Sequence, residues 1–204
     1  MDADFSIELG DEDPVLDFPW KDPSGKLAYV NVKRHPELMA QIEEAVRFPE
    51  LKEFLSQLNF PQSLLETAKC DAWSTEELSL EEEIYEAKYK FATYVDVVFV
   101  EACHDPNAED LNSGNQPARH SFAAHEQFAR KLVELLHRVP DTSSSAEIGV
   151  RRCYYENTGS SKEGYYCTLY VNGYGSDEET ARQNWAAALN VTANVISQMW
   201  AWRS

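Results

Sequence analysis

Glycine and cysteine are both scarce in this sequence, with 8 and 4 residues among 204. The low glycine content argues against a loop-rich barrel. The cysteines, at positions 70, 103, 153 and 167, are too few and mostly too far apart for a disulfide scaffold, and they fit a reducing compartment. The N-terminal stretch is acidic where a secretory signal would be basic and then apolar, and no later run approaches membrane-spanning length. We therefore expect a soluble cytoplasmic protein.

Basic residues are also few, because 18 Lys and Arg face 35 Asp and Glu, giving a net charge of −17. A negative field repels phosphate backbones and anionic lipids, so nucleic acid and membrane surfaces are not expected partners. The acids are partly concentrated in two blocks, which either recruit a basic protein partner or form a solvated face that maintains solubility. They are Asp2, Asp4, Glu8, Asp11, Glu12, Asp13 and Asp17, and Glu76, Glu77, Glu81, Glu82, Glu83 and Glu86.

Motifs for cofactors and metals are missing. No glycine-rich nucleotide loop occurs, so no cofactor is predicted. His120 and His125 would point about 140° apart on a helix and could not readily share a metal ion. Glu134 and His137 have a spacing of three, but a di-iron site would need further carboxylates from facing helices. We predict no metal site.

One short run has the inventory for nucleophilic catalysis. Cys103, His104 and Asp105 place a thiol, an imidazole and a carboxylate together. Adjacent residues on a strand point to opposite faces, so the three groups could align only if the chain folds back. An enzyme with a Cys103/His104 thiol site, or with a site assembled from distant residues, is therefore the alternative hypothesis rather than the leading one.

The hydrophobic pattern indicates alternating strands and helices. A hydrophobic content of 43% and an aromatic content of 12% suit a folded core, and we expect a single domain over residues 1–204. Residues 1–25 are predicted as an N-terminal arm or edge strands, and residues 104–117 as a flexible loop. The other predicted strands are 27–32, 66–73, 85–101 (with a bulge or bend), 147–156 and 164–173, and the predicted helices begin at residue 36, at residue 51, at residue 118 and, with a Ser176–Glu179 capping box, at residue 176.

This order predicts an α+β fold. Strand pairs alternate with helices, and hairpins cannot form parallel crossovers, so we expect a largely antiparallel sheet with helices mainly on one face. A faint echo links AKCDAW and TYVDVVF to RRCYYE and LYVNGYG. Either a duplicated ferredoxin-like or ββα unit or chance similarity between strands would explain it.

The segment RRCYYENTGSSKEGYYCTLYV, residues 151–171, is nearly a mirror image. Mirror pairing would place Cys153 opposite Cys167, within reach of a disulfide, but would leave neither face apolar. A register slipped by one residue pairs Val150 with Val171 and collects the apolar side chains on one face. We prefer the slipped register, because burial of about five side chains at roughly 1.5 to 3 kcal/mol each outweighs a disulfide that the cytosol would reduce.

The second face of this hairpin is the candidate binding site. It carries Arg151, Tyr155, Tyr166 and Tyr170, residue types that are enriched in interfaces. The competing interpretation is that another strand or the N-terminal arm covers them. We expect a non-enzymatic binding protein whose partner is a basic protein or a small ligand, with self-association as a further use of the same face.

Overall fold

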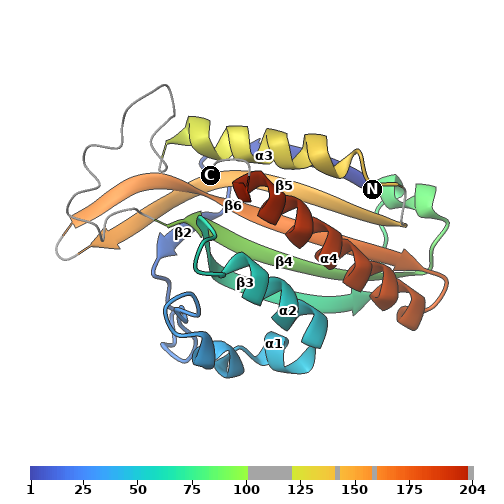
Figure 1. The fold of residues 1–204 in the computed structure, drawn as a ribbon, viewed down its shortest axis with the longest axis horizontal. Coiled ribbons are helices and arrows are strands. Elements are labelled where there is room, and N and C mark those ends of the chain that lie inside the picture. The colour runs from blue at the N-terminus through green and yellow to red at the C-terminus, as the bar shows by residue number, and fades with distance from the viewer. Residues whose placement is uncertain (101–120, 141–142, 158–159, 202–204) are drawn as a thin grey trace.

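The structure, a computed structural model, describes residues 1–100, 121–140, 143–157 and 160–201. Strands and helices alternate in the predicted order, and the fold is α+β (Figure 1). The strands are β1 (Asp2–Glu8), β2 (Val15–Phe18), β3 (Leu65–Thr75), β4 (Tyr89–Phe99), β5 (Ser144–Asn157) and β6 (Ser160–Gly175); the helices are η1 (Pro36–Gln41), α1 (Glu43–Arg47), α2 (Pro49–Leu58), η2 (Leu80–Tyr85), α3 (Phe122–Leu136) and α4 (Glu178–Ala201). The predicted loop 104–117 lies outside the described residues.

The sheet has six strands in the order β1-β5-β6-β4-β3, and β2 continues beside β5 beyond the end of β1. The pairs β3–β4, β4–β6 and β5–β6 are antiparallel, but β1 and β2 both run parallel to β5. The prediction of a largely antiparallel sheet therefore needs a correction at this edge. The first two strands reach β5 through long connections rather than tight turns, so no hairpin imposes the antiparallel direction on them.

Three helices cover one face of the sheet, as predicted. Helices α3 and α4 pass in front of the strands in Figure 1, and α2 packs beside α4 and against β3. Trp185 of α4 is fully buried against Phe91 of β4 and Phe48. The close approach depends on Gly173 of β6, because a Cβ atom there would lie 2.0 Å from the backbone nitrogen of Trp185. A glycine on the sheet thus lets the longest helix lie directly on its central strands.

The β5–β6 hairpin keeps the predicted faces but not the predicted pairs. Val150 lies opposite Cys167, and Arg151 opposite Tyr166. Pairing continues as far as Asn157 and Ser160, so the connection is tighter than the sequence suggested. Because the observed and predicted registers differ by an even number of residues, every side chain remains on its predicted face. Cys167 faces the helices, Cys153 faces away, and both are free thiols, so the prediction of no disulfide is confirmed.

Two local predictions were wrong. Residues 27–32 form no strand; a single bridge joins Lys21 to Ala28, and the backbone of Tyr29 donates to Trp20. The chain is instead held there by side chains, since the Lys33 ammonium donates to three backbone carbonyls. The second wrong prediction is the Ser176–Glu179 capping box: at the start of α4, the Asp177 carboxylate rather than the Ser176 hydroxyl accepts a hydrogen bond from the backbone amide of Thr180.

No helix in the described part of the chain is both long and apolar enough to cross a membrane.

Candidate binding face

The face of the sheet turned away from α2, α3 and α4, here called the open face, carries most of the polar side chains of the strands. Its register brings together residues from distant parts of the chain. One row crosses five strands, with the members Asp4, Glu147, Tyr170, Tyr94 and Asp71. The neighbouring row runs through Gly149, Thr168, Asp96 and Lys69. Strand alternation places all these side chains on the open face.

One end of the open face is covered by residues 15–20, the part of the predicted N-terminal arm that is called the arm from here on. Leu16 packs with Cys153 and Tyr166 in a second, smaller core cluster. The ring nitrogen of Trp20 donates to the carbonyl of Ala68 at 2.5 Å, and Phe18 meets the ring of Tyr155 edge-on at 5.9 Å. The arm therefore adds a thin apolar layer over part of the sheet that no helix covers.

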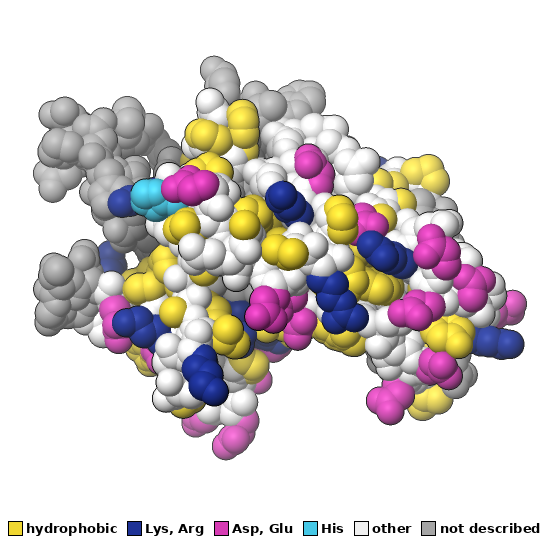
Figure 2. Space-filling view, turned by 90° about the horizontal axis from the view of Figure 1, so that it is seen from below, with side chains coloured by type: hydrophobic (Ala, Val, Ile, Leu, Met, Phe, Trp, Pro, Cys, Tyr) yellow, Lys and Arg dark blue, Asp and Glu magenta, His cyan; other side chains and the backbone are white. Residues whose placement is uncertain are grey.

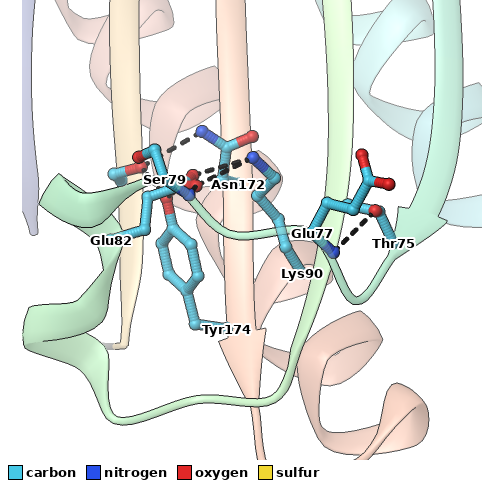
Figure 3. A network of polar contacts seen from close by, with 8 residues as sticks. Thr75, Glu77, Ser79, Glu82, Lys90, Asn172 and Tyr174 are labelled. Carbon is cyan, nitrogen blue, oxygen red and sulfur yellow. Dashed lines mark hydrogen bonds and ion pairs between the residues drawn. The ribbon is translucent and has the colours of Figure 1, made fainter.

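The opposite end is covered by η2, as Figure 3 shows. The rings of Tyr85 and Tyr174 stack at 4.0 Å. Glu82 accepts hydrogen bonds from Lys90 at 2.8 Å and from the Tyr174 hydroxyl at 2.9 Å. Burial would raise the pKa of Glu82, but these hydrogen bonds and the Lys90 charge lower it overall. This ion pair is largely shielded from solvent and anchors η2 to the sheet.

Between the two covers lies a hydrogen-bonded network centred on Arg151, which is buried. Its guanidinium contacts Glu8 at 2.7 Å, the Thr168 hydroxyl at 2.9 Å and the Tyr170 hydroxyl at 3.2 Å. Thr168 in turn donates to Asp96 at 2.7 Å. Burial would lower the pKa of Arg151, but its bonds to Tyr170 and Glu8 outweigh burial and raise it. Arg151 therefore remains charged and holds the network together.

Two features show how closely this network is packed. Gly149 faces it, and a Cβ atom there would lie 3.0 Å from Glu8 Oε1 and 3.4 Å from Arg151 Nε. Asp96 is only 6% exposed, and burial raises its pKa to about 6 although Thr168, Arg151 and Lys69 oppose the shift. The network is a buried structural element with little open space for a ligand.

The part of the open face between the covers that remains accessible carries aromatic rings, carboxylates and the exposed Lys69, whose ammonium lies 6.0 Å from the centre of the Tyr94 ring. Tyr170 and Tyr94 are half-buried with their rings 6.3 Å apart, and Trp73 lies 6.4 Å from Tyr94 with 38% of its surface exposed. Glu147 and Asp71 flank the tyrosines and are exposed. Burial, together with the charges of Glu8 and Asp4, raises the pKa of Glu147. The carboxylates at this edge thus repel one another and would be stabilised by an added cation.

The four residues predicted for binding adjoin one another, but they differ in how accessible they are. Arg151 and Tyr166 are buried, the first in the polar network and the second under the N-terminal arm. Tyr155 is half-buried, and its hydroxyl donates to the carbonyl of Tyr165. Only Tyr170 belongs to the accessible row. The competing interpretation, in which the arm covers this face, is correct at the end of the face that carries Cys153. The rest of the face is formed jointly by β5, β6 and residues of β3 and β4.

The sequence reasoning missed Tyr94, Trp73, Asp71 and Glu147 as site residues. Trp73 and Asp71 lie two residues apart on β3, so strand alternation alone puts them on one face. What the sequence could not show is that β4 pairs with β6, which puts Tyr94 directly opposite Tyr170. The signal that could have found them was the strand order of the whole sheet.

The three cysteines among the described residues are buried or half-buried thiols. Burial raises the pKa of the Cys70 and Cys153 thiols to about 12 and also raises that of Cys167, so none of the three is an activated nucleophile. Cys103, His104, Asp105 and His120 lie outside the described residues. Within the residues that are described, no three His, Cys, Asp or Glu side chains are placed to hold a metal ion. Glu134 instead pairs with Lys131 and Arg138.

Comparisons with known proteins add no assignment. No family model, no curated protein and no solved structure matches this chain. Inferences about function therefore depend on the geometry and charge of the open face.

Proposed function

We propose that this chain is a non-enzymatic, acidic, cytoplasmic protein that binds a basic segment of another protein on its open face. The observation that carries the proposal is the accessible row of Glu147, Tyr170, Tyr94 and Asp71, with Trp73 beside it. Trp73 and the carboxylates of Glu147 and Asp71 suit lysine and arginine side chains, because the indole ring attracts a cation over its face and each carboxylate pairs with it. The rings of Tyr170 and Tyr94 already lie 5.6 Å and 6.0 Å from the cationic groups of Arg151 and Lys69, so they supply contact area beside these groups.

The charge distribution supports a basic partner over a neutral one. The whole chain carries −17, and Asp4, Glu147 and Glu8 meet at the β1 edge of the accessible row. Burial raises the pKa of Glu147, and repulsion by Glu8 and Asp4 adds to this shift while the charge of Arg151 opposes it. A bound cation would relieve this repulsion, and the overall field would speed the encounter with a positively charged protein.

Binding can be tested with the full chain and a synthetic peptide of about ten residues in which lysine alternates with valine. The double variant Glu147→Gln/Trp73→Ala removes one carboxylate and one ring from the open face, and both residues are exposed. Each such contact contributes roughly 0.5 to 1 kcal/mol, so we expect the dissociation constant of the peptide to be about tenfold larger. Calorimetric titration measures it.

The matched control is Asp11→Asn/Phe60→Ala, which removes one exposed carboxylate and one exposed ring outside the strands of the sheet. This control should change affinity by less than about twofold. Equal losses in both double variants would show that the peptide responds only to net charge and would overturn the proposal. Failure of the peptide to bind the unaltered chain would overturn it as well.

We also propose that the chain contains a duplicated ββα unit, with β3-β4-α3 and β5-β6-α4 as its two copies. The register supports this, because Tyr94 and Tyr170, which occupy the same place in the echo TYV and LYV, lie directly opposite each other on the central strands. An axis of twofold pseudosymmetry through that pair would relate β4 to β6 and β3 to β5. The segments around Cys70 and Cys153, which also resemble each other, do not occupy equivalent places in the sheet. Cys70 lies opposite Val95 on β4, next to Tyr94, whereas Cys153 lies opposite Gly164 on β6, six residues from Tyr170.

A further inference from the structure

Strand β3 forms an outer edge of the sheet, and within the described residues it pairs only with β4 (Figure 1). Edge strands leave backbone groups without strand partners, and proteins usually shield them. The first half of this edge is shielded by side chains. Lys33 Nζ donates to the carbonyl of Leu65 at 2.9 Å, Asn59 Oδ1 accepts from the amide of Thr67 at 3.1 Å, and Trp20 donates to the carbonyl of Ala68. A bulge between Thr67 and Lys69 adds to the protection.

The second half of the edge, Cys70–Thr75, is arranged differently. The hydroxyl of Thr93 on β4 donates to the carbonyl of Asp71, so the backbone of Asp71 faces β4. Alternation then turns the backbone groups of Cys70, Ala72 and Ser74 outward. The Ala72 amide is held by the side chain of its own neighbour, Asp71, at 2.7 Å, a local contact that an incoming strand can replace.

We infer that the Cys70–Thr75 edge receives the basic segment of the partner as an additional β-strand. This inference rests on the proposed function and specifies how the segment binds. An added strand would gain backbone hydrogen bonds from Cys70, Ala72 and Ser74. Its alternate side chains would extend the open face beside Asp71 and Trp73, which are both exposed there.

Charge around this edge favours a cationic segment. Asp71, Glu76 and Glu77 are exposed along or just after it, and the charge of Glu44 also acts on the Cys70 thiol. Figure 2, the view from the lower side of Figure 1, shows hydrophobic side chains exposed in several patches between charged ones rather than as one apolar surface. A second copy of the chain would bring another net charge of −17 to the same edge and would be repelled. We therefore assign the edge to a basic partner.

The test compares two peptides on the unaltered full chain. One is the alternating lysine and valine peptide, and the other has the same sequence with methylated backbone nitrogens, so it keeps the charge but cannot donate backbone hydrogen bonds. We expect the methylated peptide to bind at least about tenfold more weakly. Hydrogen exchange should slow at Cys70 and Ser74 when the first peptide binds.

A variant pair tests the same edge from the protein side. Ser74→Pro removes an outward amide without removing a bond to β4, whereas Ser74→Ala keeps the amide and removes only an exposed hydroxyl. Ser74→Pro should weaken binding of the first peptide about tenfold, Ser74→Ala should not, and thermal unfolding by circular dichroism verifies that both variants fold.

The outcomes separate the inference from the proposed function. Equal affinity for both peptides, with no exchange protection at β3, would overturn strand addition while leaving binding to the open face intact. Binding of neither peptide would overturn the proposed function itself. Self-association in sedimentation that Ser74→Pro abolishes would assign the edge to a second copy and also overturn the inference.

Discussion

The two faces of the sheet are stabilised in different ways. On the helix-covered face, apolar side chains such as Trp185, Leu169 and Val171 are buried beneath three helices. On the open face, Arg151 and Asp96 are also buried but are held by hydrogen bonds, and short segments cover the two ends of this face. We expect the first face to tolerate little added volume, because backbone atoms meet there, and the second to accept added volume where flexible side chains can move but not a change of charge. The accessible aromatic row lies on the second face, where stability depends less on close packing.

Two glycines give the strongest test of this difference. Gly173→Ala introduces a methyl group that meets the backbone of α4, 2.0 Å from the Trp185 nitrogen. Because these are backbone atoms, no side-chain rotation can relieve the clash and the whole helix must shift. We expect a loss on the order of 3 kcal/mol or more in the free energy of unfolding. Urea denaturation measures it.

Gly149→Ala is the matched variant on the open face. Its methyl group meets the ends of two flexible side chains, the closest being Glu8 Oε1 at 3.0 Å. We expect a loss of about 1 kcal/mol or less, because Glu8 and Arg151 can adjust their side chains. Comparable losses in the two variants would contradict the claim that the two faces respond differently to added volume.

Ionisation of Asp96 on the open face should have the next largest effect on the free energy of unfolding. The pKa of Asp96 rises from 3.8 to about 6 on folding, mainly through burial. Because the folded value is the higher one, the contribution of Asp96 to stability is fully present below pH 3.8 and is lost as the pH rises through about 6. The loss is on the order of 3 kcal/mol. Asp96→Asn cannot ionise, so its stability relative to the unaltered chain should increase by this amount across the same range.

The pH comparison has a simple control. Asp11→Asn removes an exposed carboxylate from the N-terminal segment. Urea midpoints measured across the acid range for both variants give the difference directly, since the other titrating groups are shared. If the stability of Asp96→Asn relative to the unaltered chain does not increase as the pH rises through this range, water reaches Asp96 more than its 6% exposure indicates.

Much of the fold followed from residue periodicity, because alternation reports which side chains share a face. It placed Val150, Cys167 and Leu169 together correctly even though the pairs were wrong, since face assignment requires only the parity of the register. The helices α3 and α4 were likewise clear from their apolar stripes. The parallel pairing of β1 with β5 could not be foreseen, because it depends on where a long connection returns the chain.

The candidate site was only partly predictable for the same reason. Tyr170 and its neighbours lie on one hairpin, so local sequence shows that they share a face. Tyr94 and Trp73 join them only through the β4–β6 pairing. The burial of Tyr166 depends on Leu16, about 150 positions earlier in the sequence. Contacts between segments so far apart leave no periodic signal in a single sequence.

The N-terminal arm provides the smallest effect and tests how firmly the open face is covered. Trp20→Phe keeps an aromatic ring but removes the donor to the Ala68 carbonyl, which should cost about 1 kcal/mol. A looser arm would expose Cys153, now fully buried beneath Leu16, so a thiol reagent should modify Cys153 several times faster, as located by peptide mass spectrometry. Leu27→Ala, an exposed change in the adjoining segment, serves as the control. Unchanged labelling in Trp20→Phe would mean that β2 pairing alone holds the arm, and that the open face is as firmly closed at this end as the opposite face is under its helices.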